Sequence, residues 1–246
     1  MSALDRIRVV LVSPSHAGNV GSAARAMKVM GLSRLALVTP RYADVLTLDE
    51  TLALASGAVD VLEHATVHPT LDAALEGTLH AVALSSRDRE YAPPLFALGD
   101  ACRDALAHDG DVAFVFGSER YGLSNDDVLR CTARCRIETA ADYASLNLAQ
   151  AVQLVTYGCR MAALALDDAI PPASTTPRAA THEERQDLFA HLEEGLVAIG
   201  YLDPDAPKKL MPRVRRLFAR ARLEHDEVQW LRGMAKAMTK AAKERG

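Results

Sequence analysis

The 246-residue sequence is poor in aromatic side chains and lacks several signals that identify common classes of protein. Phe, Trp and Tyr make up 5% of the residues, which argues against an aromatic platform for stacking single-stranded bases. No apolar run reaches the length of a membrane span, and the start of the chain has no signal-peptide cleavage pattern. We therefore expect a cytoplasmic protein that does not contact a membrane.

Cysteine pairs and metal-ligand motifs are also missing. The cysteines at 102, 131, 135 and 159 form no CxxC pair, and an isolated cysteine is usually a small buried hydrophobe. Cys131 and Cys135 could hold a metal, but no histidine-rich segment lies near them in the sequence. The segment 182–191 does not contain an HExxH motif, so the sequence predicts no metal site. Four free thiols suit a reducing cytoplasm.

The net charge of −4 argues by itself against a nucleic acid partner, but the charges are unevenly distributed. Residues 208–246 contain 12 Lys or Arg against 4 Asp or Glu, whereas residues 1–207 contain 16 against 28. A basic tail on an acidic body suggests a polyanionic partner. Basic residues without an acidic one among them stand at Lys208, Lys209, Arg213, Arg215, Arg216, Arg220 and Arg222. We interpret them as an RNA phosphate-binding surface, with a solvated helix face as the alternative.

Strand-like and helix-like segments alternate over the first two thirds of the chain. Apolar runs of strand length occur at 7–12, 35–38, 81–84, 112–116 and 135–137. Helical patterns lie between them, near 20–30, 47–56, 70–77 and 95–108. This alternation predicts an α/β fold in which helices flank a parallel sheet.

The last third of the chain has a different character. A helix predicted over 146–166 is apolar nearly all round, so we expect it to be buried, in the core or in a subunit interface. The segment 167–180 is rich in Pro, Ser and Thr, which is typical of a linker. Thr181 with Glu184 predicts a capping box, and helices near 212–222 and 225–242 follow. We expect domains at 1–166 and 181–246, the second small, all-α and basic.

Polar residues gather where the first strand ends, in SPSHAGNVGSAARAMKVMG. Asn19 is a good helix N-cap and Gly31 a good C-terminal stop. Arg25 lies off the apolar stripe of this helix, with Lys28 three residues later. Ligands bind at the carboxyl edge of open α/β sheets, where this helix begins, so Arg25 could contact a ligand. Its spacing alone favours the simpler interpretation, a solvated arginine on the surface.

Two further segments follow later strands. In FVFGSERYGLSNDD, Gly117 and Gly122 flank Glu119, which indicates a loop that approaches a ligand or a plain turn before a helix capped by Ser124. In CRIETAADYASLNLAQAV, Ser145 and Asn147 precede the long helix, whose free amides could bind an acceptor. Capping by Ser145 is the simpler interpretation.

Together and in this order, NVGSAAR, FGSERYGL and SLNLAQAV resemble the three motifs of SpoU-type SPOUT methyltransferases, over about residues 5–166. The basic tail is similar to that of the TrmJ-like tRNA methyltransferases, which methylate the ribose of nucleotide 32 in the anticodon loop. The resemblance implies an enzyme that uses S-adenosyl-L-methionine, acts on tRNA and forms a homodimer with active sites at the subunit interface. It also implies a C-terminal trefoil knot in the α/β domain. An rRNA 2′-O-methyltransferase and a non-catalytic RNA-binding protein of the same fold are the alternatives.

The resemblance also assigns site residues. The catalytic set is Arg25, Asn19, Glu119, Ser145 and Asn147, with Glu119 orienting Asn19. The cofactor set is Leu84, Ser85, Ser86, Gly117, Ile137, Ala144, Ser145 and Leu146, where relatives often have Thr in place of Leu84. RNA contacts are expected from Lys28, Lys208, Lys209, Arg213, Arg216 and Arg220. Because a guanidinium stays charged, we expect Arg25 to grip a phosphate and stabilise alkoxide charge, while the phosphate or His16 takes the proton.

Overall fold

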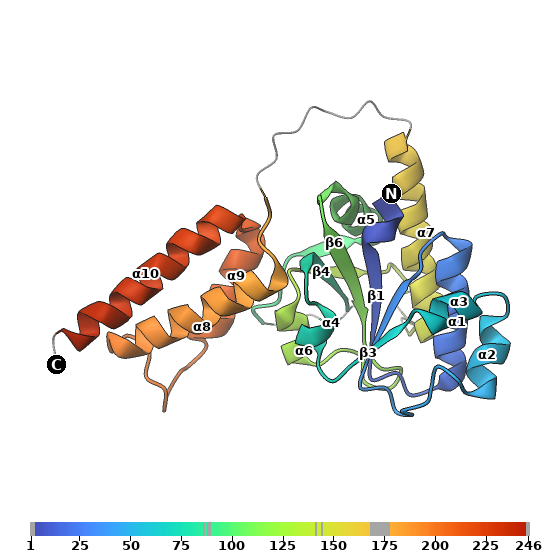
Figure 1. The fold of residues 1–246 in the computed structure, drawn as a ribbon, viewed down its shortest axis with the longest axis horizontal. Coiled ribbons are helices and arrows are strands. Elements are labelled where there is room, and N and C mark those ends of the chain that lie inside the picture. The colour runs from blue at the N-terminus through green and yellow to red at the C-terminus, as the bar shows by residue number, and fades with distance from the viewer. Residues whose placement is uncertain are drawn as a thin grey trace.

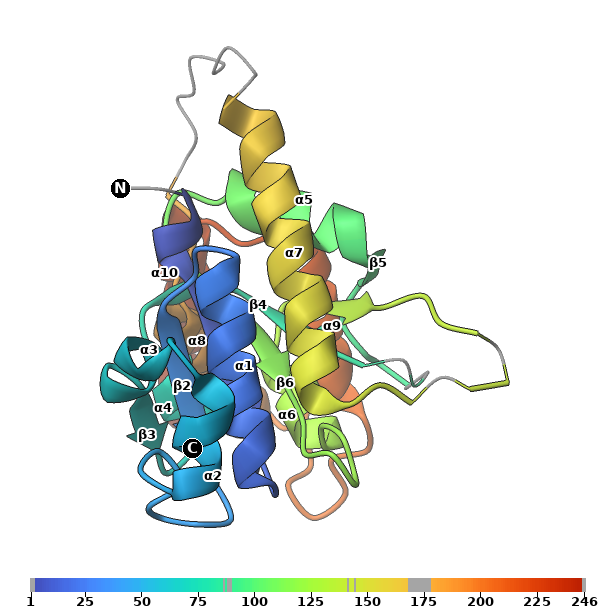
Figure 2. The same ribbon diagram turned by 90° about the vertical axis from the view of Figure 1, so that its right-hand side faces the viewer.

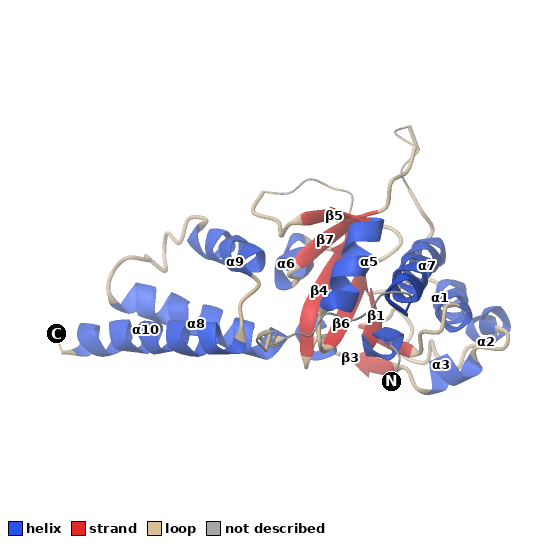
Figure 3. Ribbon diagram, turned by 90° about the horizontal axis from the view of Figure 1, so that it is seen from above, coloured by secondary structure: helices blue, strands red, loops and turns tan. Residues whose placement is uncertain are grey.

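A parallel sheet between two layers of helices, with a helical unit beside it, makes up the computed structural model (Figures 1 and 3). It describes residues 3–85, 87, 90–140, 142–143, 145–167 and 178–244. The strands are β1 Ile7–Val12, β2 Arg34–Val38, β3 Thr66–His68, β4 Thr78–Leu84, β5 Leu95–Ala97, β6 Asp111–Phe116 and β7 Ala133–Arg136. Around them lie η1 Ala3–Arg6, α1 Ala17–Val29, α2 Asp49–Ala55, α3 Val59–Glu63, α4 Leu71–Ala74, α5 Leu98–Ala107, α6 Asn125–Arg130 and α7 Leu148–Asp167. The helical unit contains α8 His182–Ala198, α9 Leu210–Ala221 and α10 His225–Lys243.

The sheet has the strand order β3-β2-β1-β6-β4-β7-β5, and every neighbouring pair is parallel. Along β1, Val9 and Leu11 face the layer of α1, α5 and α7, whereas Val10 faces α4 and α6. Both faces of the central strands are therefore buried, which explains why these strands appear in the sequence as continuous apolar runs. The predicted α/β fold is confirmed.

Strand β7 lies between β4 and β5, although both come before it in the chain. The segment that joins β4 to β5 is held by the buried side chain of Arg134, on β7. Its Nε donates to the carbonyl of Pro93 at 3.1 Å and its Nη1 to the carbonyl of Arg87 at 3.0 Å. β7 thus fixes the loop that leaves the carboxyl end of β4.

Several elements differ from the sequence-based expectation. The apolar pattern does not predict α3, β3 or β5, which are all short, and the helix expected from 95 begins at Leu98, after β5. Within the single chain the long helix is buried along one face only, and its expected burial in a subunit interface stays a prediction. Its inner face packs on α1 and α5, but Leu154, Tyr157, Met161 and Leu164 are 37–51% exposed. Their spacing makes one apolar stripe along α7.

Some predicted helix ends are confirmed and two are wrong. Thr181 forms the capping box with Glu184, and Ser124 caps α6. Gly31, with φ of +82°, follows the end of α1 as predicted. Asn19 is not an N-cap, because α1 begins two residues earlier at Ala17. Ser145 does not cap α7, whose first amides are bound by another residue described below.

The helical unit packs on the sheet domain through buried polar contacts. Arg185 is 6% exposed, and its Nη1 donates to the carbonyls of Leu79 and Ala180. His182 contacts Asp72 at 3.0 Å. The helices predicted near 212–222 and 225–242 are confirmed. Most of the predicted linker lies outside the described residues. A bilayer-spanning helix is absent from the described part of the chain, since none combines the required length and apolarity.

Candidate active site

Glu119, in the loop after β6, binds the backbone and side chains at the start of α1. Its carboxylate accepts hydrogen bonds from Ser15 N at 2.8 Å, Ser15 Oγ at 2.7 Å, His16 N at 3.2 Å and Asn19 Nδ2 at 2.8 Å. Burial raises the pKa of Glu119, but the hydrogen bonds from Asn19 and Ser15 outweigh this effect and leave the pKa below its ordinary value. A charged carboxylate therefore binds the amides that precede the helix, which is favourable at a helix N-terminus.

Asn19 and Asn147 extend this network to α7. The Oδ1 of Asn19 accepts from Asn147 Nδ2 at 2.8 Å. The Oδ1 of Asn147 in turn accepts from the amides of Ala149 at 2.9 Å and Gln150 at 3.3 Å, so Asn147 supplies the cap that the sequence assigned to Ser145. We call Glu119, Asn19 and Asn147 the motif bridge, because they join one residue from each of the three sequence motifs. The expected contact between Glu119 and Asn19 is present.

The loop that carries Glu119 is unusually tight. A Cβ atom at Gly117 would lie 2.1 Å from the carbonyl carbon of Gly122, so no side chain fits there. Gly122 has φ of +69°, a conformation that favours glycine, and its N–H donates to the carbonyl of Ser118 at 2.8 Å. The glycines let the backbone fold back on itself beside the end of β6.

A pocket of about 380 Å³ lies beside the motif bridge. Five residues predicted to bind a cofactor line it, namely Leu84, Ser85, Gly117, Ser145 and Leu146. Ile137 does not line it and instead packs against the core. The predicted residues Ser86 and Ala144 lie outside the described residues. The volume falls in the range of small-molecule pockets, about 300–1,000 Å³.

Other lining residues do not stand out in the sequence. They include Arg87, Phe116, Ser118, Tyr121, Leu148 and Ala151. Ser118 and Tyr121 lie inside the segment FGSERYGL, and Leu148 and Ala151 lie inside SLNLAQAV, so membership of a motif was the available signal. The pocket therefore combines the loop after β4 with the second and third motifs.

Comparison with known proteins identifies the family of this chain. Residues 6–157 match the model of the SpoU rRNA Methylase family. The chain belongs to this family. Residues 183–246 match a second model, the C-terminal domain of the tRNA methyltransferase TrmJ.

Individual relatives place this SpoU-family chain in the TrmJ group. It is 42% identical to the tRNA (cytidine/uridine/adenosine-2′-O-)-methyltransferase TrmJ of Pseudomonas aeruginosa, over 98% of this chain and 96% of the relative. It is 41% identical to the tRNA (cytidine/uridine-2′-O-)-methyltransferase TrmJ of Cronobacter sakazakii, over 98% and 99%. The crystal structure of TrmJ from Z. mobilis superposes with a TM-score of 0.80 at 31% identity, covering 94% of this chain and 98% of that one.

Arg25, the arginine of the first SpoU motif, does not line the pocket. It is exposed on α1, and no hydrogen bond or ion pair to it occurs among the described residues. Lys28 is already engaged, since its Nζ contacts Asp60 Oδ1 at 2.7 Å and the carbonyl of Gly57 at 2.8 Å. Within one chain, the motif bridge lies beside the pocket, whereas Arg25 contacts neither of them.

The basic residues of the TrmJ-type tail divide into two groups. Lys209 pairs with Glu90, and Arg213 donates to the hydroxyl of Tyr91 at 3.1 Å. Arg215 donates a hydrogen bond to Gln186, and Arg222 forms an ion pair with Asp104. The second group is exposed and makes no hydrogen bond or ion pair within the described residues; over residues 208–222 it consists of Lys208, Arg216 and Arg220, and Lys236 and Lys243 on α10 also belong to it.

A second cleft of about 960 Å³ lies between this tail and the loops that follow β4 and β6. Its lining includes Lys209 and Pro212 from the tail, together with Tyr91. It shares Ser118 and Tyr121 with the smaller pocket, so the two hollows adjoin.

The cysteine pair considered from the sequence cannot share a metal. Cys131 belongs to the core on the α4 and α6 side of the sheet, whereas Cys135 belongs to the core on the α1, α5 and α7 side. All four cysteines are buried.

Proposed function

We propose that this protein transfers a methyl group from S-adenosyl-L-methionine to the ribose 2′-oxygen of a tRNA, and that the target is nucleotide 32. Relatives named as tRNA 2′-O-methyltransferases match nearly the whole chain, which supports the substrate and the reaction. The observation that carries the proposal is the motif bridge, which places all three SpoU motifs beside one pocket. Nucleotide 32 follows from the resemblance of the tail to the TrmJ group.

The pocket fits the proposed cofactor in its chemistry. Leu84 and Leu146 offer apolar surface for an adenine ring, and the glycines at 117 and 122 leave the main chain of the tight loop without side chains at two lining positions. Main-chain contacts to the cofactor would not depend on the side chain at position 84, where relatives often have Thr and this chain has Leu84. When bound, S-adenosyl-L-methionine would supply an electrophilic sulfonium methyl group for the ribose oxygen, and its sulfur would leave as a neutral thioether.

Arg25 is proposed to act on the RNA and not on the cofactor. Its guanidinium remains charged at ordinary pH, so it cannot serve as a base. It binds the phosphate next to the target ribose and stabilises negative charge that develops on the 2′-oxygen. The hydroxyl proton goes to that phosphate or to His16, which is exposed and whose main-chain amide is fixed by Glu119.

A homodimer would bring Arg25 to a pocket. Helices α1 and α7 lie side by side (Figure 2), and α7 presents the apolar stripe of Leu154, Tyr157, Met161 and Leu164. Exposed apolar stripes of this kind mark protein–protein interfaces. We propose that two chains pair through this surface, that Arg25 of one faces the pocket of the other, and that the second and third motifs form the family's trefoil knot.

The exposed tail residues Lys208, Arg216 and Arg220 are proposed to bind tRNA phosphates. Lys28, Lys209 and Arg213 would first have to exchange their intrachain partners, so they are expected to contribute less affinity.

The Arg25→Ala variant tests the assignment. Losing an interaction made mainly in the transition state should lower the single-turnover rate on the order of 10²–10³-fold, with the calorimetric affinity for S-adenosyl-L-methionine unchanged. Arg6→Ala, which removes a half-buried arginine paired with the exposed Asp109 and distant from the pocket lining, is the control and should retain normal turnover. Near-normal turnover by Arg25→Ala, or loss of cofactor binding, would contradict the assignment.

The target nucleotide needs a separate experiment. A tRNA with 2′-deoxyribose at nucleotide 32 has no acceptor oxygen there and should accept no labelled methyl group. A ribose at nucleotide 32 in the otherwise identical tRNA is the control. Methylation of both tRNAs would show that the methylated nucleotide is not nucleotide 32. Methylation of ribosomal RNA alone would favour the rRNA alternative.

A further inference from the structure

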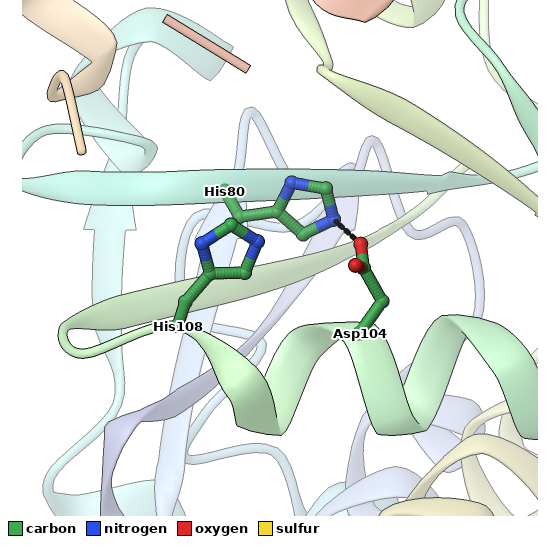
Figure 4. Close-up of side chains that lie close together, drawn as sticks. All are labelled: His80, Asp104 and His108. Atoms are coloured by element: carbon green, nitrogen blue, oxygen red, sulfur yellow. Dashed lines mark ion pairs between the residues drawn. The ribbon is translucent and has the colours of Figure 1, made fainter. Parts of the chain in front are cut away.

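Three ligand-type side chains meet far from the proposed active site, at the other end of β4. His80 lies in the amino-terminal half of that strand, Asp104 on α5 and His108 directly after α5 (Figure 4). One ligand atom from each lies within 4.8 Å of the other two. Asp104 and His108 are four residues apart, which places both on one face of the helix.

The atoms that face one another in this cluster lack hydrogen-bond partners. Five buried side-chain N or O atoms among the described residues have none, and three of them are His80 Nε2, Asp104 Oδ2 and His108 Nε2. The Nε2 of His80 lies 3.3 Å from Asp104 Oδ2, an ion-pair contact when the ring is protonated (dashed in Figure 4), but the two atoms form no hydrogen bond. An orphaned buried polar atom costs about 1–3 kcal/mol, so three at one point indicate a missing common partner.

The hydrogen bonding of Thr132 indicates what that partner is. Its hydroxyl donates to the carbonyl of Ala81 at 3.0 Å and lies 2.8 Å from His80 Nδ1. With the hydroxyl proton on the carbonyl, Nδ1 donates to the hydroxyl, and Nε2 of the neutral ring carries a lone pair; this is the tautomer that a metal ion on Nε2 requires. That lone pair faces a carboxylate, an arrangement that calls for a cation between them.

We propose that His80, Asp104 and His108 form a binding site for a divalent transition-metal ion. Two imidazoles and one carboxylate suit Zn²⁺, and they leave a fourth position for water or another ligand. That position opens toward a pocket of about 610 Å³ between the sheet domain and the helical unit.

Groups behind the ligands already hold them in place. Thr132 fixes the ring of His80, and Arg222 of the helical unit binds the other oxygen of Asp104, Oδ1, at 2.6 Å. Such supporting contacts orient metal ligands in known sites. Arg222 and Arg185 also line the pocket as positive charges, which makes the site weaker than the same ligands in a neutral surrounding. The metal would thus bind where the two units of the chain meet.

The test uses tag-free, chelator-treated full-length protein with Zn²⁺ as the probe. Calorimetry should show one Zn²⁺ per chain, and Zn²⁺ should raise the midpoint of thermal unfolding because it binds only the folded site. His108→Gln should abolish both effects while unfolding at the wild-type temperature without metal. His64→Gln is the matched control, since His64 is also the residue after a short helix, α3, but is exposed and outside the cluster.

Asp104→Asn provides a second variant that keeps the side-chain shape, and it should also lose the metal response. Co²⁺ in place of Zn²⁺ should give visible ligand-field absorption in the wild type and in His64→Gln only. No Zn²⁺ binding by the wild type would overturn the proposal. Equal Zn²⁺ affinity in the wild type, His108→Gln and Asp104→Asn would do the same, because it would assign the metal to other groups, such as the buried thiols.

Discussion

Replacing Glu119 by Gln removes the acceptor that ties the start of α1 to the loop after β6. The carboxylate takes hydrogen bonds from two amides, one hydroxyl and the Asn19 side chain. A glutamine offers one acceptor oxygen, and its NH₂ group would face donors. Each hydrogen bond to a charged group contributes about 1.5–3 kcal/mol, and partial exposure reduces this, so we expect unfolding to become easier by about 2–3 kcal/mol. Turnover should fall too, because the helix that carries Arg25 loses its anchor.

Urea unfolding at a series of pH values measures this effect. The pKa of Glu119 is lowered in the folded protein, so the ionised carboxylate stabilises the fold above its unfolded pKa, near 4.5. That stabilisation is lost as the pH falls through the folded pKa. The difference between wild type and Glu119→Gln should therefore be full at pH 7 and shrink below about pH 4.5. Glu63→Gln, at an exposed glutamate of α3, is the control and should show almost no difference. Equal midpoints for wild type and Glu119→Gln at pH 7 would refute the reasoning, as would a difference that does not change with pH.

Two further predictions concern assembly and RNA. Met161→Glu places a charge in the middle of the apolar stripe and should shift sedimentation from dimer to monomer, with loss of turnover, whereas Lys240→Glu on α10 should leave the dimer intact. Replacing Lys208, Arg216 and Arg220 together by Gln should weaken tRNA binding and flatten the log–log salt dependence by roughly 2–3, at about 0.7–0.9 for each phosphate contact. Replacing the paired Lys209 and Arg213 should have a smaller effect, and filter binding across a salt series compares the two sets.

Local signals in the sequence were sufficient for much of the fold. Continuous apolar runs predicted the buried strands β1, β2, β4 and β6, because a strand covered on both faces has no polar side. The capping box at Thr181 needs only residues three apart, and Gly31 needs only its own conformational freedom. Short β3 and β5 lie at the edges of the sheet and carry exposed residues, so they lack this signal.

Contacts between distant residues could not be predicted in the same way. Asn19 is a suitable N-cap by type, but Glu119, a hundred residues later, binds the amides before α1 and draws the Asn19 side chain to itself. The spacing of Asp104 and His108 was visible in the sequence, whereas their meeting with His80 depends on α5 lying over β4. The motif resemblance placed five of the eight predicted cofactor residues in the pocket, because it carries information about spatial neighbours that residue spacing lacks. It did not separate Ile137, which is part of the core.

The position of β7 constrains how the chain can be made. β5 is the edge strand of the sheet and its hydrogen-bonding neighbour is β7, which is synthesised some 35 residues later. A nascent chain that has emerged only as far as β6 has no strand for β5 to join, and the segment held by Arg134 has nothing to hold it. The sheet can be completed only when residues 133–136 enter between strands made earlier. Translation pauses before this point should therefore leave an unpaired strand exposed, and refolding of the full chain should be slow for its size, as expected where assembly depends on late, distant contacts.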